Sequence, residues 1–154
     1  MSRPDPELVT LEPVTTAVIR GVVPPAELAN FFDESFGVLG QVLAAQGVRA
    51  TGAAFALYHR PPTETFDLEV GYPTDRPIEP NGSAAEGTLP AGRAVRWVYA
   101  GGFDGLAGAW ERLATWVGEQ GLTPGEAQWE TYLVEPNPEM DPADLRTELV
   151  WPLA

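Results

Sequence analysis

Residues 28–48, LANFFDESFGVLGQVLAAQGV, and residues 102–122, GFDGLAGAWERLATWVGEQGL, carry one pattern twice, at a separation of 102 − 28 = 74 positions. In each stretch, apolar residues recur at spacings of three and four, which is the stripe of an amphipathic helix. A glycine then ends the stripe, as expected of a left-handed C-terminal cap. The positions that match in order are Phe32 with Leu106, Phe36 with Trp110, Leu39 with Leu113, Leu43 with Val117, and Gly47 with Gly121. The chain is therefore predicted to contain an internal repeat.

The repeat extends beyond the helices into the segments around them. The same separation places Tyr58 on Tyr132 and Pro62 on Pro136. Apolar and β-branched runs between turn residues predict strands, and Asp104 is a suitable N-cap for the second helix. The predicted strands cover 12–22, 53–59 and 66–72 in the first half, and 95–100, 128–134 and 145–151 in the second. Each half therefore has the order strand–helix–strand–strand.

One such half has a single helix over three strands and buries too little apolar surface to be stable alone. We therefore expect one α+β domain over residues 1–154, with a first module at about 9–73 and a second at about 93–153. The Pro- and Gly-rich segment 74–92 is the expected linker, within which 87–89 is a candidate for a short extra strand. The modules are expected to form one mainly antiparallel sheet with both helices on one face and a central ligand cleft between them.

Composition excludes several classes of function. The 154 residues include no cysteine and one histidine, so thiolate chemistry and a catalytic zinc site have no support, and we expect no metal and no cofactor. The net charge of −13 and nine scattered Lys and Arg residues argue against direct nucleic-acid binding. No stretch has the length of a membrane span or the pattern of a signal peptide, which favours a cytoplasmic location. The acidic character favours a cationic small molecule or a basic protein partner, although acidity also simply keeps proteins soluble.

The strand Gln128-Trp129-Glu130-Thr131-Tyr132 is the most informative stretch for function. Side chains alternate across a strand, so Gln128, Glu130 and Tyr132 share one face. If that face looks toward the helices, a carboxylate lies on the floor of an aromatic groove. Burial would raise the pKa of this carboxylate and an incoming cation would lower it again, which would suit recognition of an amine or another lipophilic cation. The alternative is an outward, solvated carboxylate paired with an arginine.

Aromatic side chains are the candidate walls of such a groove, because ring faces attract cations. Tyr58 and Tyr132 are favoured since they occupy matching positions in the two halves. The other candidates are Trp97, Tyr99 and Phe55, whereas Trp110 and Trp116 lie on the helical stripe and are expected to be core.

Several phrases of the sequence together resemble one known family. They are Trp129-Glu130-Thr131-Tyr132 followed by Pro136, then Leu145-Arg146-Thr147-Glu148-Leu149 ending at Pro152, and, earlier, Ala56-Leu57-Tyr58-His59, Asp67-Leu68-Glu69-Val70-Gly71-Tyr72-Pro73 and Leu89-Pro90-Ala91-Gly92-Arg93. Their order and spacing resemble the GyrI-like effector-binding domains, which are related to the AraC-type and SOUL-like bacterial effector-binding domains. The resemblance covers about residues 9–153.

The resemblance implies two pseudo-symmetric modules and a cleft that binds hydrophobic, often cationic compounds of the multidrug type. It also implies that Glu130 meets the ligand's charge, with Tyr132 beside it. No helix-turn-helix precedes the domain in this sequence, so the resemblance is to a stand-alone member, and a role in transcription regulation would need a partner.

Three functions stay open from the sequence. The first is a small-molecule binder that uses Glu130, Tyr132, Tyr58, Trp97, Tyr99 and Phe55 and has no catalytic residue. The second, which the resemblance implies, is a hydrolase of reactive cyclopropane-bearing natural products, with Glu130 as acid or base and Glu69 as a helper. The third is a regulatory protein that contacts a basic surface on a regulator or a topoisomerase such as gyrase.

Overall fold

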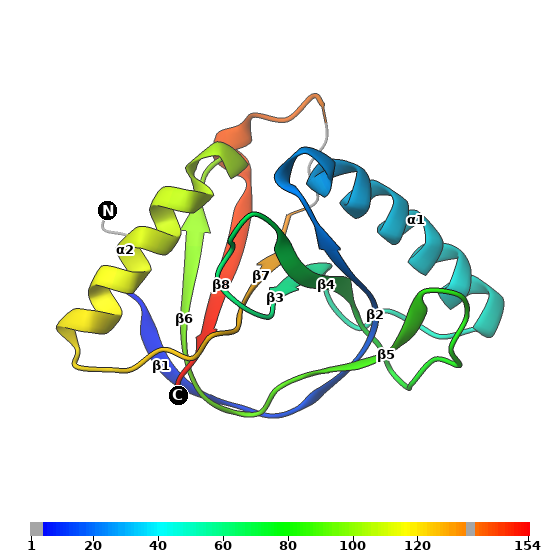
Figure 1. The fold of residues 1–154 in the computed structure, drawn as a ribbon, viewed down its shortest axis with the longest axis horizontal. Coiled ribbons are helices and arrows are strands. Elements are labelled where there is room, and N and C mark those ends of the chain that lie inside the picture. The colour runs from blue at the N-terminus through cyan, green and yellow to red at the C-terminus, as the bar shows by residue number, and fades with distance from the viewer. Residues whose placement is uncertain (1–4, 135–137) are drawn as a thin grey trace.

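The computed structural model describes residues 5–134 and 138–154 and is shown in Figure 1. Eight strands form one sheet in the order β1-β6-β8-β7-β3-β4-β2-β5, and every pairing is antiparallel. The strands are β1 (Glu7–Leu11), β2 (Val14–Val23), β3 (Phe55–Tyr58), β4 (Phe66–Pro73), β5 (Ala84–Leu89), β6 (Gly92–Ala100), β7 (Gln128–Tyr132) and β8 (Arg146–Pro152). The helices are α1 (Leu28–Gln46) and α2 (Leu106–Glu119). The predicted α+β fold with a mainly antiparallel sheet and two helices is confirmed.

The two halves join at the middle of the sheet, where β3 pairs with β7. Outward from this junction, the first half continues through β4 and β2 and the second through β8 and β6, so the two halves are arranged symmetrically. Ala56 lies directly opposite Glu130 in this pairing. Since 56 + 74 = 130, these two residues are also equivalent positions of the repeat. The junction therefore lies on the pseudo-two-fold axis.

Each half also contributes one strand to the edge of the other half, which sequence reasoning did not anticipate. β1 pairs with β6 and β5 pairs with β2, and both pairings share one register, from Leu11 opposite Gly92 to Val14 opposite Leu89. This register places Pro13 opposite Pro90, at the bends between β1 and β2 and between β5 and β6. In Figure 1 the two bent strands run together along the bottom of the view. The expected linker therefore contains a six-residue strand that ties the halves together.

The helices end as the sequence predicts, but α2 begins differently. Gly47 and Gly121 have φ values of 63° and 69°, the left-handed conformation that glycine adopts without strain. Asp104 is not the N-cap of α2, because it lies within a 3₁₀ turn, Phe103–Gly105, that precedes the helix. Gly105 occupies the N-cap position, with no side-chain cap. The expected strand at 12–22 corresponds to β2, and β1 is an additional strand that precedes it, before Pro13.

Alternation along the strands creates two cores, one on each face of the sheet. Toward the helices, Ala56, Leu68 and Val70 pack against α1, and Val95 and Leu149 pack against α2. On the opposite face, Phe55, Leu57, Trp129 and Val150 form a second cluster, to which β1 adds Val9 and Leu11. Among the described residues, neither helix is long and apolar enough to cross a membrane.

We predict that Gly71→Ala destabilises the protein by about 2 kcal/mol or more, because the added methyl group would meet the carbonyl oxygen of Ala17 on β2. The matched control is Gly40→Ala on α1, where the methyl group meets nothing within 4 Å. Higher helix propensity should make this control about 0.5–1 kcal/mol more stable than wild type. Urea denaturation of the two variants measures both effects. Equal stability of the two variants would contradict the close approach of β2 and β4.

Candidate functional site

A cavity of about 1210 Å³ opens between the two helices above the junction of β3 and β7. Both helices, both central strands and the loops that follow them contribute to its wall. Its lining residues are Leu28, Ala29, Phe32, Asp33, Phe36, Ala53, Ala54, Tyr58, Pro62, Phe66, Tyr72, Phe103, Leu106, Ala107, Trp110, Gln128, Glu130, Tyr132 and Leu133. The cavity is mainly apolar and aromatic, as small-molecule sites usually are.

The carboxylate of Glu130 lies on the floor of this cavity and is almost fully buried, with 7% of the residue exposed. The indole Nε1–H of Trp110 donates a hydrogen bond of 2.9 Å to Oε1. The hydroxyl of Tyr132 donates one of 2.9 Å to Oε2. Both donors are neutral, so hydrogen bonding holds the carboxylate in place without neutralising its charge.

Burial raises the pKa of Glu130 above its ordinary value of 4.5, and the hydrogen bonds from Trp110 and Tyr132 oppose this rise without cancelling it. The pKa values of two neighbouring phenols, Tyr58 and Tyr132, are raised as well. Burial, assisted by the negative charge of Glu130, raises the pKa of Tyr58 and of Tyr132, so both hydroxyls stay protonated and able to donate. The floor of the cavity thus holds one titratable carboxylate among neutral donors.

The cavity repeats the internal symmetry of the chain. Many of its lining residues form pairs 74 positions apart, one member from each half: Ala29 with Phe103, Phe32 with Leu106, Asp33 with Ala107, Phe36 with Trp110, Ala54 with Gln128, and Tyr58 with Tyr132. The symmetry breaks at the carboxylate, because Ala56 is the equivalent of Glu130 and Phe36 the equivalent of its hydrogen-bond donor Trp110. At these two positions the second half supplies the buried charged group and its indole partner, and the first half supplies apolar side chains.

Aromatic rings pack against one another around the carboxylate. Tyr132, which binds Glu130, contacts the edges of two further rings, Phe32 at 6.4 Å and Phe103 at 5.8 Å between centroids. Phe103 and Leu133 are partly exposed, at 42% and 46%, so apolar surface reaches the mouth of the cavity. Edge-to-face contacts of this kind hold the rings in defined orientations.

The charges of the lining are all negative. Among the lining residues that the structure describes, the charged ones are Glu130 on the floor and Asp33 on α1, and none is Lys, Arg or His. Asp33 is exposed to solvent. A cavity with this lining favours positive molecules and disfavours anions.

The structure brings together some of the residues predicted from the sequence and separates others. Tyr58, Glu130 and Tyr132 all line the cavity. Trp97 and Tyr99 do not, because they are buried beneath α2 with Leu113 and Val117. The guanidinium of Arg112 lies 5.7 Å from the Trp97 ring and 6.0 Å from the Tyr99 ring, so these rings already face a cation from the protein itself.

Phe55 lies outside the cavity as well. It is three residues from Tyr58 on β3, and an odd spacing on a strand places the two rings on opposite faces. Its side chain is fully buried in the cluster on the face away from the helices, beside Trp129. The sheet therefore separates Phe55, which the sequence suggested for the ligand cleft, from the cavity.

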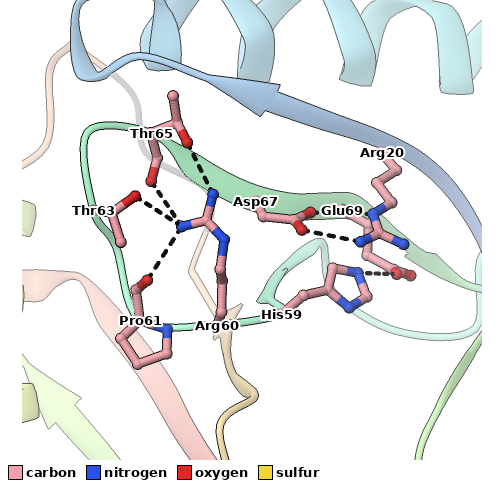
Figure 2. Close-up of polar contacts among 8 residues, drawn as sticks. All are labelled: Arg20, His59, Arg60, Pro61, Thr63, Thr65, Asp67 and Glu69. Atoms are coloured by element: carbon pink, nitrogen blue, oxygen red, sulfur yellow. Dashed lines mark hydrogen bonds and ion pairs between the residues drawn. The ribbon is translucent and has the colours of Figure 1, made fainter.

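Glu69, the expected helper of a hydrolase, also lies on the face away from the helices. Its carboxylate is 2.7 Å from Nε2 of His59, and Figure 2 shows this pair beside the ion pair of Arg20 with Asp67. Arg20 binds Asp67 through two hydrogen bonds and holds the pKa of this carboxyl below its usual range. Each carboxylate of this cluster has its own hydrogen-bond partner, and the sheet separates the cluster from Glu130.

The loop between β3 and β4 is held in shape by one arginine. Arg60 donates hydrogen bonds to the carbonyl oxygens of Pro61 and Thr65 and to the hydroxyls of Thr63 and Thr65 (Figure 2). This loop carries Pro62 into the lining of the cavity. Arg60 thereby shapes part of the cavity wall without lining it. The equivalent proline of the second half, Pro136, lies outside the described residues.

Sequence reasoning missed the indole that binds Glu130. The helical stripe assigns Trp110 to the core, and its ring does pack against Trp151 at 5.7 Å. Its Nε1–H nevertheless reaches the cavity floor. The available signal was the repeat, because Trp110 and Phe36 hold equivalent positions on the sides of the helices that face each other. Sequence reasoning also missed four other aromatic residues of the lining, Phe32, Phe66, Tyr72 and Phe103.

Metal ligands do not gather in the part of the chain that the structure describes. Within residues 5–134 and 138–154, no three or more His, Asp or Glu side chains lie close enough together to hold a metal ion.

A duplicated strand–helix–strand–strand sheet with an aromatic cavity on its axis defines a small-molecule binding domain. The chain belongs to the GyrI-like family, since residues 4–154 match the model of the GyrI-like small molecule binding domain. The family resemblance seen in the sequence is thereby confirmed. No curated protein sequence matches the chain.

Solved structures share the fold at low sequence identity. The crystal structure of the EcmrR C-terminal domain matches with a TM-score of 0.85 and 22% identity over 97% of each chain. In a cryo-EM structure of an EcmrR–DNA complex, the TM-score is 0.84 at 23% identity, and the match covers 97% of this chain but only 57% of EcmrR. SAV2435, solved bound to tetraphenylphosphonium, matches with a TM-score of 0.70 and 11% identity over 98% of this chain and 94% of its own.

We predict that Glu130→Gln becomes more stable relative to wild type as the pH rises. The folded protein keeps the proton of Glu130 to a higher pH than the unfolded chain does, so this group stabilises the fold below its unfolded pKa and loses that contribution as the pH rises through its folded pKa. The difference between the variants should therefore be constant in acid and grow above pH 4.5, by about 1.4 kcal/mol for each pKa unit of the shift.

Urea denaturation of both proteins across this pH range measures the difference, in which all other titrating groups cancel. A difference that does not change with pH would show that Glu130 is not desolvated in the folded protein.

Proposed function

We propose that this domain binds a hydrophobic organic cation in the cavity between its halves, with Glu130 as the counter-charge. The observation that carries the proposal is a buried carboxylate whose hydrogen-bond donors, Trp110 and Tyr132, are both neutral. No described residue of the cavity lining balances its charge. A cationic ligand would supply the missing positive charge.

The physics of burial gives this arrangement its selectivity. Keeping Glu130 ionised away from water is unfavourable in the empty cavity, and a ligand cation nearby removes much of that penalty. The faces of Tyr58, Tyr132 and Trp110 add cation–π attraction of about 0.5–2 kcal/mol each. A neutral molecule of the same shape would gain the apolar contacts alone.

Two relatives support parts of this proposal. SAV2435 was solved with tetraphenylphosphonium, a bulky aromatic cation of the kind that the cavity suits. EcmrR was solved in a complex with DNA, and this chain spans only 57% of it. We therefore propose a multidrug-type binding domain that works in the cytoplasm and reports on its ligand through a DNA-binding partner or segment.

Hydrolysis is the competing function of the same site. Glu130, with its raised pKa, would have to act on water alone, because Glu69 lies on the other face of the sheet and lines no part of this cavity. Incubation with electrophilic cyclopropane compounds, followed by product analysis, separates the two functions. Turnover that depends on Glu130 would favour the hydrolase.

We predict that Glu130→Gln weakens binding of tetraphenylphosphonium about tenfold or more, because it removes the only buried negative charge of the described lining. Titration followed by tryptophan fluorescence measures the affinity, since Trp110 lies in the cavity wall. Wild-type affinity should also rise with pH as Glu130 ionises, and the affinity of the variant should stay flat.

The matched control is Glu69→Gln, the same chemical change at a buried carboxylate on the opposite face. It should leave binding unchanged. The proposal fails if tetraphenylphosphonium does not bind at micromolar concentrations, or if the two variants weaken binding equally.

A further inference from the structure

We infer that the cavity is suited to an elongated dication, with one positive centre at Glu130 and the second at Asp33. This inference rests on the proposed function and specifies its ligand class. It draws on the size of the cavity, on the position of its second carboxylate, and on the way in which the repeat loses its symmetry.

The first observation is size. Pockets for drug-sized ligands usually measure about 300–1,000 Å³. This cavity measures about 1210 Å³ and runs from the sheet floor to both helices. A single compact cation placed at Glu130 would leave part of it unfilled. The remaining space extends toward the rim, where the exposed lining is apolar apart from Asp33 and includes Phe103 and Leu133.

The second observation is the position of Asp33, the only other charged residue of the described lining. Its side chain is exposed, and among the described residues no cationic group pairs with it. It follows Phe32 on α1, and the ring of Phe32 contacts the ring of Tyr132, whose hydroxyl binds Glu130. The contacts that lead from the α1 rim to the floor carboxylate thus run through Phe32 and Tyr132. One small cation would contact one carboxylate or the other, and a ligand with two separated charges would contact both.

The third observation is that the rim carboxylate of Asp33 has no acidic counterpart at the equivalent position of the other half. Asp33 is equivalent to Ala107 on α2, and the floor carboxylate Glu130 is equivalent to Ala56. The two acids thus come from opposite halves of a nearly symmetric cavity. They define one direction, from the floor of the second half toward the α1 rim. A long aromatic dication laid along this direction would have an anion near each end and rings along its length.

The test compares a bis-quinolinium, two N-alkylquinolinium rings joined by a decamethylene chain, with the N-decylquinolinium monocation. Binding of each is measured with wild type, Asp33→Asn, Glu34→Gln and Glu130→Gln. Glu34 is the matched control, because it is the exposed neighbour of Asp33 and lies on a separate small hollow with Glu27 and Phe31. Both substitutions change the net charge by the same amount.

We expect Asp33→Asn to lower the affinity for the dication about threefold to fivefold, the size of effect that an exposed charge pair has. It should leave the affinity for the monocation unchanged, and Glu34→Gln should leave both unchanged. Added salt should reduce the effect of Asp33→Asn, since the rim is exposed to solvent. A dication with two identical ends can bind in two equivalent orientations. This statistical factor is the same for wild type and variant, so it cancels from the ratio of their affinities.

The inference is overturned if both variants weaken the dication equally, which would reflect net charge, or if Asp33→Asn leaves the dication unaffected. Failure of the proposed function has a different signature. In that case the monocation would not bind wild type, or would bind Glu130→Gln equally well.

Discussion

The antiparallel pairing of β3 with β7 is the constraint on which the rest of the site depends. It joins two halves that would each be too small to fold alone, and its register sets Glu130 opposite Ala56 on the pseudo-two-fold axis. A shift of one residue would turn Trp129 toward the helices and Glu130 into the apolar cluster on the other face. Packing of the apolar cores on both faces of the sheet therefore fixes the position of the Glu130 carboxylate in the cavity.

The crossing strands explain why a cavity can persist between the halves. Were the halves joined only at β3 and β7, the helices could close over the groove and bury its aromatic surface. Because β1 pairs with β6 and β5 with β2, each half is also held by the outer strand of the other. These strands, bent at Pro13 and Pro90, brace the two halves against each other, so that aromatic rings line an open space rather than a collapsed core.

Sequence patterns predicted the fold well because both helices and most strands follow simple periods, and because the repeat supplied each assignment twice. The alternation of β7 placed Gln128, Glu130 and Tyr132 on one face but left open whether that face looks toward the helices, and no pattern could place a residue sideways across the sheet. Trp97 and Tyr99 share the helix-facing side, yet β6 is two strands from β7, so α2 covers them. The sequence could not predict that β1 pairs with β6 and β5 with β2, because no local pattern specifies which strand an edge strand pairs with. Phe55 is different, because its odd spacing from Tyr58 already placed it on the other face.

Duplication and asymmetry have separate roles in this protein. Duplication alone gives a large cavity whose two halves present similar aromatic rings, such as Tyr58 and Tyr132, and such a cavity would accept flat molecules in either of two orientations. The asymmetric positions remove this ambiguity: Glu130 and Trp110 face Ala56 and Phe36 across the axis, and Asp33 faces Ala107. Under the proposed function, apolar contacts would supply affinity without strict shape, while the placement of charge would decide which molecules enter and how they lie. A few substitutions at axis and rim would therefore retune the ligand without disturbing the sheet, because none of these side chains joins the two halves.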